Sequence, residues 1–360
     1  MSVLNNFTVS IAKGLRRLRH NKELCGHGSI SRKENTRLKM EKCLIVSKVT
    51  RYEYERHMHD NIADSDLEVI LRKRGSDFDS MIETHRQQKA FEENVASSLK
   101  SMGLQVEMAS RLTYNDELIK WCDVVVPCGG DGTFLLAASR VRDATKPVIG
   151  FNSAPHKSVG RLCLPTWCSN DVKGAFTALK EPGFFSVQVF IGESVTSRVS
   201  LLRLQIDNGQ WTHTKSSGLC VTTGTGSTSW HYSINCLRTH SVLELMQILN
   251  EDFDVKMDTT LEKAREVAER YNQKLMFPPD SAYLAYSVRE YITFEEWPAP
   301  RGLRVRDRAG CVRVKSHCSD AGLVIDGSVS FPFNDGTKAL LEVYPEDSLM
   351  TVQMDDSLPY

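Results

Sequence analysis

Five consecutive residues, Gly129-Gly130-Asp131-Gly132-Thr133, combine a permissive backbone with one acidic side chain. Three glycines allow a turn with positive φ and a close approach to a ligand, and amides at a helix start can hold phosphate oxygens. A carboxylate would repel phosphate there. We therefore expect Asp131 to orient and deprotonate a hydroxyl that attacks a phosphoryl group, while metal and basic groups offset the charge. The alternative is a structural turn in which Asp131 only caps the helix.

The residues around this turn predict a strand before it and a helix after it. Residues 124–126 form an apolar run that suits a buried parallel strand, and residues 134–138 suit a helix packed on it. Further strands are expected at residues 43–48, 105–109 and 147–150, and helices at 66–74, 85–102 and 115–121. This order predicts a parallel, Rossmann-like α/β domain over residues 41–165.

Two arginines follow the first expected strand. Arg51 and Arg56 come after its carboxyl end, which is where open α/β sheets bind ligands. Either guanidinium could reach a phosphate. The alternative is that both are ordinary solvated charges on the surface.

The second half of the chain has a different pattern. Short apolar or alternating runs predict strands at residues 199–205, 218–221, 303–314, 322–325 and 339–343. Helices are expected only at residues 241–250 and 259–275. We therefore predict a β-rich, β-sandwich domain over residues 166–350 with a helical insertion at about 241–275, followed by an exposed tail at 351–360.

A second glycine cluster lies in this half, at residues 222–230. Small hydroxylated residues with glycine can wrap closely around a sugar or phosphate. The alternative is an ordinary serine-rich loop. Together with the first cluster, this segment predicts a ligand held between the two domains.

Bulk composition limits the class of protein. The chain has 360 residues, of which 41% are hydrophobic and 25% charged, and no apolar run approaches the roughly 20 residues that span a bilayer. We therefore expect a soluble protein with no membrane span. Formal net charge is zero, so composition gives no reason to expect nucleic acid as a partner. The ten cysteines include no CxxC pair, which favours reduced thiols over a zinc site.

The first 40 residues differ from the rest. They carry nine Lys or Arg against two Glu, a net charge of +7, so the remaining 320 residues carry a net charge of −7. Apolar residues share one face of a possible helix here, namely Leu4, Phe7, Ile11, Leu15 and Leu18. A basic, amphipathic, acid-poor start is typical of a mitochondrial transit peptide and predicts location in the mitochondrial matrix. The alternative is a disordered or surface-helical N-terminus.

The two glycine clusters, in this order and about 95 residues apart, resemble the NAD kinase family and specifically its mitochondrial branch. The resemblance extends from about Glu41 nearly to the end. Its landmarks are residues 48–54, 123–139, 146–152, 160–165, 190–194, 215–219, 223–230 and 325–336. Ser217 stands where the wider family has aspartate, and the mitochondrial branch accepts serine there.

The resemblance implies a fold of the NAD kinase and diacylglycerol kinase type. It also implies ATP-dependent phosphorylation of the 2′-hydroxyl of the adenosine ribose of NAD, giving NADP, with Mg²⁺ or another divalent metal and no metal ligand assigned to the protein. Asp131 would be the base. Gly129, Gly130, Gly132, Thr133 and Asn152 would match the phosphate and nucleotide side. Gln188, Thr225, Gly226, Ser227, Thr228, Ser229, Trp230 and Ser233 would match the NAD side. Family members assemble, so we expect a homo-oligomer, such as a dimer.

One departure from the family raises a question about activity. The family usually has an Asn-Glu pair where this chain has Val187-Gln188. Loss of the carboxylate would cost on the order of 1.5 to 3 kcal/mol of NAD binding. The preceding segment, residues 168–186, also looks shorter than in the family. Two alternatives to an active NAD kinase follow: a lipid kinase of the diacylglycerol type, which shares the first turn, or an NAD-binding isoform with impaired catalysis.

Overall fold

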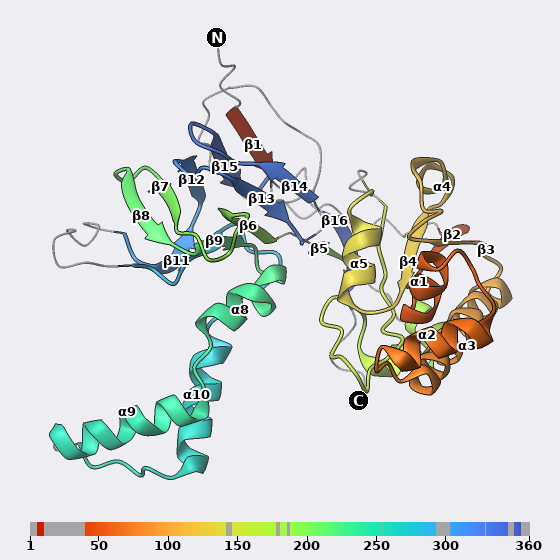
Figure 1. Cartoon of the computed structure of the whole chain (residues 1–360), viewed down its shortest axis with the longest axis horizontal. Coiled ribbons are helices and arrows are strands. Elements are labelled where there is room, and N and C mark those ends of the chain that lie inside the picture. Colours follow the sequence, from red (N-terminus) through yellow and green to blue (C-terminus); the bar gives the residue numbers. More distant parts are fainter. Residues whose placement is uncertain are drawn as a thin grey trace. The chain divides into compact units, whose positions relative to one another are not determined.

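The chain divides into two compact units in the computed structural model (Figure 1). The α/β unit comprises Arg32–Phe184 and Leu349–Tyr360, and the sandwich unit comprises Met1–Ser31 and Phe185–Ser348. The structure describes residues 6–10, 40–141, 146–177, 181–185, 188–253, 255–292, 303–327, 329–344 and 349–353. Each unit has its own core and is described separately.

The α/β unit is built on a parallel sheet in the order β3-β2-β4. Its strands are β2 (Lys42–Ser47), β3 (Gln105–Ser110) and β4 (Val124–Cys128). The next predicted strand pairs in parallel with β4 through the bridges Val125↔Val148 and Cys128↔Phe151. All five residues of β4 are buried, as its apolar composition predicts for a central parallel strand.

The end of the chain returns to this unit. Val148 donates a backbone hydrogen bond to Met350 of β16 (Leu349–Gln353), which in turn pairs with β5 (Glu181–Phe185). The tail expected at residues 351–360 therefore begins inside a strand, and residues 354–360 lie outside the described residues. The pattern of apolar and polar residues over Leu349–Gln353 is too short to predict a strand there rather than an exposed end.

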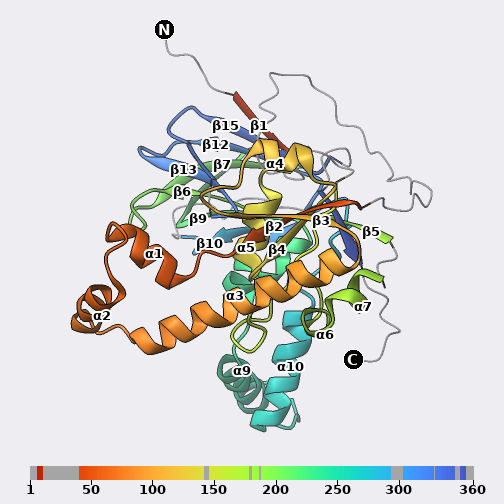
Figure 2. The same cartoon turned by 90° about the vertical axis from the view of Figure 1, so that its right-hand side faces the viewer.

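Seven helices of the described chain belong to the α/β unit. They are α1 (Arg51–Met58), α2 (Asp64–Lys73), α3 (Phe78–Ser101), α4 (Asp116–Trp121), α5 (Asp131–Ala138), α6 (Thr166–Asn170) and α7 (Val172–Thr177). The long α3 lies across the sheet (Figure 2) and buries Val95, Ala96 and Leu99 against it. Cys168 and Phe176 join the same core, so the unit continues to Phe184 rather than ending near residue 165.

The sandwich unit consists of two sheets. Their orders are β1-β15-β12-β7-β8 and β11-β10-β9-β6-β13-β14. The pairs are antiparallel except β1 with β15. The strands are β1 (Asn6–Ser10), β6 (Gln188–Glu193), β7 (Ser200–Ile206), β8 (Thr212–Ser216), β9 (Gly218–Thr222), β10 (Leu284–Arg289), β11 (Arg306–Ala309), β12 (Cys311–Ser316), β13 (Ala321–Ile325), β14 (Val329–Pro332) and β15 (Lys338–Glu342).

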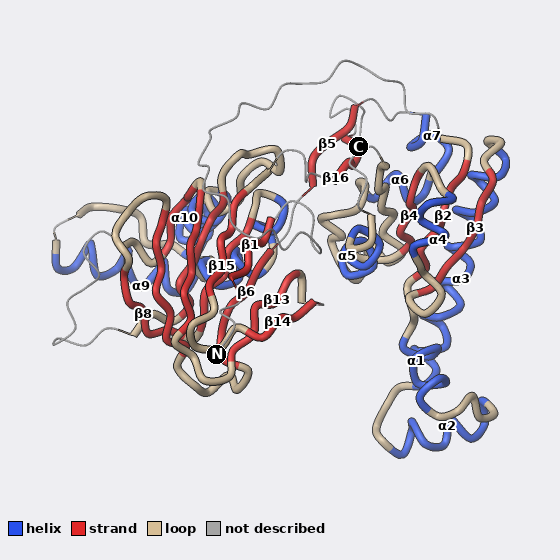
Figure 3. Tube along the Cα trace, turned by 90° about the horizontal axis from the view of Figure 1, so that it is seen from above, coloured by secondary structure: helices blue, strands red, loops and turns tan. Residues whose placement is uncertain are grey.

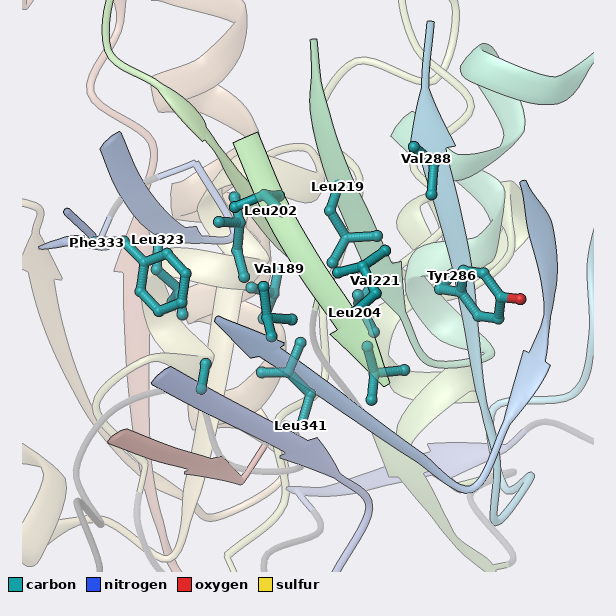
Figure 4. Close-up of a cluster of buried hydrophobic side chains, with 14 of the residues drawn as sticks. Val189, Leu202, Leu204, Leu219, Val221, Tyr286, Val288, Leu323, Phe333 and Leu341 are labelled. Carbon is teal, nitrogen blue, oxygen red and sulfur yellow. The ribbon is translucent and has the colours of Figure 1, made fainter. Parts of the chain in front are cut away.

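One hydrophobic core joins the two sheets (Figure 4). Leu202 and Leu204 of β7 point into it from one sheet, and Leu219 and Val221 of β9 from the other. Alternate residues along β7 are exposed or half-buried, which is the pattern expected of a sheet with one face in a core. The predicted N-terminal α/β domain and C-terminal β-sandwich are both confirmed.

The single strand expected at residues 303–314 is in fact two strands in different sheets. β11 pairs with β10, whereas β12 pairs with β7 and β15. At the break, the Asp207 carboxylate accepts hydrogen bonds from the amides of Gly310 and Cys311, at 2.8 and 2.9 Å. These bonds hold the corner where the chain crosses between the sheets. They join residues that are 103 and 104 positions apart in the sequence.

The helical insertion is a hairpin of α9 (Thr239–Asp252) and α10 (Leu261–Gln273) (Figures 1 and 3). The chain reaches it through the short helix α8 (Trp230–Asn235) (Figure 1). α9 and α10 pack together through a small separate core of Val242, Met246, Ala264 and Ala268. The insertion was predicted from the sequence; α8 was not.

The expected N-terminal helix is wrong where the structure describes it. Residues Asn6–Ser10 form strand β1, which pairs in parallel with β15. Their sequence, Asn-Phe-Thr-Val-Ser, is rich in strand-forming types, and the edge of β15 offers backbone groups for pairing. Leu4, Ile11, Leu15 and Leu18 lie outside the described residues. Across the described part of the chain, no helix has the length and apolar character to cross a membrane.

Candidate active site

The first glycine cluster forms the turn between β4 and α5. Gly129 follows β4 directly, Gly130 caps α5, and Asp131 is the first helical residue. The expected positive φ is wrong, because none of the three glycines adopts it and Gly130 has φ −94°. Gly129 is required for space instead. A Cβ there would lie 2.8 Å from the Cβ of Thr133 and 3.1 Å from that of Lys48.

Asp131 is half-exposed at the start of α5, and its carboxylate is held from outside the helix. Oδ1 accepts a hydrogen bond from the amide of Leu162 at 2.9 Å. Cys163 lies next along the chain and donates its thiol proton to the Gly129 carbonyl at 3.6 Å. Burial, together with the Asp131 charge, raises the pKa of the Cys163 thiol to about 12, so it stays protonated. Leu162 and Cys163 therefore bond their loop to two residues of the glycine turn, Asp131 and Gly129.

Asn152 is buried and shapes the loop that carries Leu162. Its Nδ2 donates to the Ser158 carbonyl at 2.8 Å, and its Oδ1 accepts from the Ala154 amide at 3.1 Å. Gly160, at φ +60°, passes so close that a Cβ there would lie 2.8 Å from the Asn152 Cγ. The structure therefore gives Asn152 an internal bonding role; contact with a nucleotide stays a prediction.

The early stretch at residues 48–54 forms the neighbouring end of the sheet. The Lys48 amide donates to the Cys128 carbonyl at 3.2 Å, so β2 and β4 end side by side, and the Lys48 side chain is exposed. Thr50 caps α1 in a capping box with Glu53. The position of Lys48 beside Gly129 makes it a cation that the sequence reasoning did not single out.

A buried polar network links α3 to the same edge. Glu92 is almost wholly buried and accepts from Gln88 Nε2 at 2.7 Å, while Lys89 Nζ lies 3.1 Å from its other oxygen. Gln88 also donates to the Cys128 carbonyl at 3.1 Å. Lys89 bridges to Glu53 at 2.7 Å. These bonds fix the end of β4 just before the glycine turn.

Arg51 and Arg56 are engaged at the surface of the α/β unit. Arg51 donates to Ser76 Oγ at 3.0 Å, and Arg56 donates to the Tyr52 hydroxyl at 3.3 Å. These contacts fit the interpretation of both arginines as surface charges. Phosphate binding by either one stays a prediction.

The second cluster lies in the sandwich unit and turns through a short 3₁₀ helix, Thr225–Thr228, into α8. Gly224 and Gly226 are tightly packed: a Cβ on Gly224 would lie 2.8 Å from the Phe277 carbonyl oxygen, and one on Gly226 would lie 3.2 Å from Gln188 Cβ. Ser227 is buried and its hydroxyl donates to the Gly224 carbonyl. These three features show that the turn is closely packed.

The remaining hydroxyls of this cluster divide into those that bond the backbone and one that does not. Thr228 Oγ1 donates to the Thr225 carbonyl at 3.2 Å, and Ser233 Oγ donates to the Ser229 carbonyl at 3.2 Å. Thr225 Oγ1 is buried without a hydrogen-bond partner among the described residues. A buried hydroxyl left unpaired is costly, so Thr225 is the member of the cluster with most to gain from a ligand.

Gln188 ties this cluster to two strands. Its Oε1 accepts from Ser229 Oγ at 2.9 Å, and its Nε2 donates to Cys220 Sγ at 3.0 Å. Its backbone amide donates to the Asp326 carboxylate at 3.0 Å. Val187 lies outside the described residues. Gln188 thus orients the segment expected to bind NAD, and the carboxylate that bonds its backbone is Asp326, which sequence reasoning missed.

Trp230 presents an aromatic surface at the end of the cluster. It is 41% exposed and stacks on Phe190 with ring centroids 4.4 Å apart. The Arg289 guanidinium lies 5.9 Å from the indole centroid. His231, the next residue, is buried against Ser287, and burial lowers its pKa to about 4, so it anchors α8 as a neutral ring. Arg289 was also missed, because its proximity to Trp230 depends on β10 pairing with β9.

The predicted site residues therefore form two groups, one in each unit. Asp131, Asn152 and the first glycines lie together at the carboxyl edge of the parallel sheet. Gln188 and residues 225–233 lie together at one end of the antiparallel sheet. The described residues contain no cluster of three or more His, Cys, Asp or Glu that could hold a metal ion. Mg²⁺ needs no such cluster, because it usually keeps several waters and binds one or two carboxylates plus substrate phosphates.

These observations define an architecture of two units. One is a parallel α/β unit with a glycine turn and an acid at a helix start, and the other is an antiparallel sandwich with a second glycine segment. Residues 29–158 match the family described as the ATP-NAD kinase N-terminal domain. The chain is 31% identical to human NAD kinase 2, mitochondrial, covering 93% of this chain and 88% of that protein. It is 30% identical to the rat protein of the same name, covering 93% and 92%.

The chain is also similar to an NAD kinase from Archaeoglobus fulgidus solved in complex with ATP. That structure shares 15% identity and a TM-score of 0.49, with 88% of this chain and 94% of that chain covered. The sequence relationships decide the assignment: the chain belongs to the NAD kinase family.

Proposed function

We propose that this protein is an NAD kinase that transfers the γ-phosphoryl group of ATP to the 2′-hydroxyl of the adenosine ribose of NAD, giving NADP and ADP. The observation that carries the proposal is Asp131, half-exposed at the first position of α5 and held by the Leu162 amide. Family membership favours a dinucleotide over a lipid as the acceptor.

Asp131 has two features of a general base in this reaction. One carboxylate oxygen is fixed by Leu162, which leaves the other to accept the proton of the attacking hydroxyl. The packed Gly129–Thr133 contact keeps the helix start in place. Because the transition state of phosphoryl transfer is loose, positioning and charge supply most of the rate, and a general base typically adds about 10² to 10⁴.

The phosphates require positive charge beside this acid. Lys48, whose exposed side chain starts next to Gly129, is the cation that the fold places there, and the amides at the start of α5 add partial charge. A divalent metal, when bound with ATP, neutralises phosphate charge. ATP oxygens and water would supply its ligands, because the free oxygen of Asp131 is assigned to the proton of the hydroxyl.

The sandwich unit supplies the proposed NAD contacts. Thr225 offers its unpaired hydroxyl, Trp230 a stacking surface, and Gln188 holds Ser229 in place. The neutral Gln188 replaces the carboxylate usual in the family, so we expect weaker NAD binding rather than loss of the reaction.

Incubating purified protein with ATP, Mg²⁺ and either NAD or diacylglycerol tests the proposal. NADP from NAD alone is the expected result. Phosphorylated lipid would show that the acceptor is a lipid rather than NAD. If neither substrate gives product but calorimetry shows that NAD binds, the protein is a catalytically impaired NAD-binding protein.

We further propose mitochondrial matrix location and homo-oligomeric assembly. The basic start of the chain and the names of the related human and rat proteins support the location. Imaging a fluorescent fusion of the full chain, and a second fusion of residues 1–40 alone to the reporter, tests it. Assembly is supported by exposed apolar side chains on the α9–α10 hairpin, including Leu245 and Phe253.

A further inference from the structure

The five-stranded sheet of the sandwich unit carries a row of basic side chains across one face. Lys338 of β15 lies directly opposite Lys315 of β12. Lys315 in turn lies opposite Arg203 of β7, and Arg203 lies opposite His213 of β8. Directly opposed residues in neighbouring strands share a face. The flanking positions on these strands hold core residues, so the basic row points outward: Leu202, Leu204, Val314 and Ala339.

Further basic residues widen this row. Residues two positions along the same strands share its face, and these include Lys215 and Arg313, with His317 directly after the end of β12. The His213 and His317 rings lie 5.9 Å apart, and His317 Nδ1 is 3.0 Å from the Asp335 carboxylate. We call these seven residues the cationic face: Arg203, His213, Lys215, Arg313, Lys315, His317 and Lys338. Its five Lys and Arg carry the charge, because burial and the nearby Arg203 lower the pKa of His213.

Few acids on these strands face the row of Lys338, Lys315, Arg203 and His213, although His317 beside it is paired with Asp335. Across the described outward positions of β7, β8, β12 and β15, the one carboxylate is Glu342, at the far end of β15. Like charges directly opposite each other destabilise a sheet. The chain as a whole has zero formal charge, so this surplus is local. A partner with negative charge would offset the repulsion.

Exposed apolar side chains lie among these cations. Leu201, 38% exposed, pairs with Lys215, and Trp211, 37% exposed, has the Arg203 guanidinium 5.7 Å from its ring. Aliphatic and indole groups beside Lys and Arg are typical of surfaces that enter the headgroup region of a bilayer. A single-stranded nucleic acid needs open aromatic faces for base stacking, and the indole here is already covered on one side by Arg203.

We propose that the cationic face docks the protein on the surface of an anionic lipid bilayer. Each Lys or Arg close to an anionic membrane strengthens binding about fivefold. This site is separate from the residues assigned to phosphoryl transfer and needs no catalysis.

Flotation of the full chain with lipid vesicles tests the proposal. The vesicles are pure phosphatidylcholine or phosphatidylcholine with about one-third anionic phospholipid, at low and raised salt. The test variant is Arg203→Glu with Lys315→Glu, and Arg203→Gln with Lys315→Gln is a milder version. The control, Lys73→Glu with Lys173→Glu, makes the same charge change on exposed residues of α2 and α7. All proteins keep the basic first 40 residues, and melting temperature and NADP formation verify folding.

The expected result is binding to anionic vesicles alone, weakened by salt, at least tenfold weaker in the test variant and nearly unchanged in the control. Equal weakening in the test variant and in the control would show that net charge decides binding, which would overturn the docking face. Absence of vesicle binding by the wild type would also overturn it. So would tighter binding to a single-stranded RNA, sensitive to the same variants, because the partner would then be nucleic acid.

Discussion

Asp131 is the residue on which the proposed reaction depends most directly. We expect Asp131→Asn to lower kcat by about 10² to 10⁴, because the amide cannot accept the proton of the ribose hydroxyl. The asparagine oxygen can still accept the Leu162 amide, so the turn should persist. Single-turnover kinetics measure the loss, and an unchanged melting temperature verifies the fold. Near-normal turnover would remove Asp131 from the role of base.

Gln188 offers a gain-of-affinity experiment. In Gln188→Glu, a carboxylate oxygen can keep the bond from Ser229 and supply the charge that the family usually places there. A charge-assisted hydrogen bond adds about 1.5 to 3 kcal/mol, so the Kd for NAD should fall roughly tenfold to a hundredfold. Calorimetry measures it. Gln188→Ala, which loses the Ser229 bond, should weaken binding; equal Kd values for all three proteins would place NAD away from position 188.

Asp326 should make stability depend on pH. Burial raises its pKa to about 6 from the ordinary 3.8, although the Gln188 amide partly opposes the shift. The folded state therefore binds the proton more tightly, and the unfolding free energy should fall by about 1–3 kcal/mol as pH rises from 4 to 6 and then level off.

Asp326→Asn is the matched variant for this effect. Asparagine tolerates the φ of +49° at this position and can still accept the Gln188 amide. Its unfolding free energy in urea should lack that fall between pH 4 and 6. An identical pH profile in the two proteins would show that another group titrates.

At the scale of elements, Gly129 and Gly132 of the glycine turn differ in how much space surrounds them. Gly129→Ala puts a Cβ against Thr133 and Lys48, so we expect a loss of about 1–3 kcal/mol in unfolding free energy and reduced turnover. Gly132→Ala meets no atom within 4 Å and lies in a helix, so it should stabilise the fold by up to about 1 kcal/mol. Urea denaturation compares them; equal destabilisation would contradict the packing argument.

The same elements indicate how far sequence reasoning extends. β4 and α5 were predicted because a continuous apolar run and a glycine turn are local signals. The Leu162 amide on Asp131 and the Asp326 carboxylate at Gln188 were not, because they join residues 31 and 138 positions apart. Local periodicity also failed at Asn6–Ser10, where pairing with β15 decides the conformation. The residue types of the site were visible in the sequence, whereas the groups that orient them were not.

At the scale of the whole molecule, the chain crosses between its two units more than once. The α/β unit is closed by β16, which comes after the entire sandwich, and the sandwich includes β1 from the start of the chain. Neither unit is therefore a continuous piece of sequence. Truncation near residue 165, where the composition changes, would remove β5, β16, α6 and α7 from the α/β unit.

The α9–α10 hairpin provides the test of assembly. Its small core covers one side, but Leu245, Ile248, Leu249, Phe253, Val255 and Leu261 remain exposed, Phe253 by 66%. Burying such residues between copies gains roughly 25 cal/mol per Å², so light scattering should give at least twice the 40.6 kDa chain mass. Leu245→Glu with Phe253→Glu should reduce the mass toward 40.6 kDa. The control, Val69→Glu with Leu112→Glu, alters apolar residues of the α/β unit that are at least as exposed, and it should leave the mass unchanged. A wild-type mass of one chain would contradict assembly, and an unchanged mass in the hairpin variant would place the interface elsewhere.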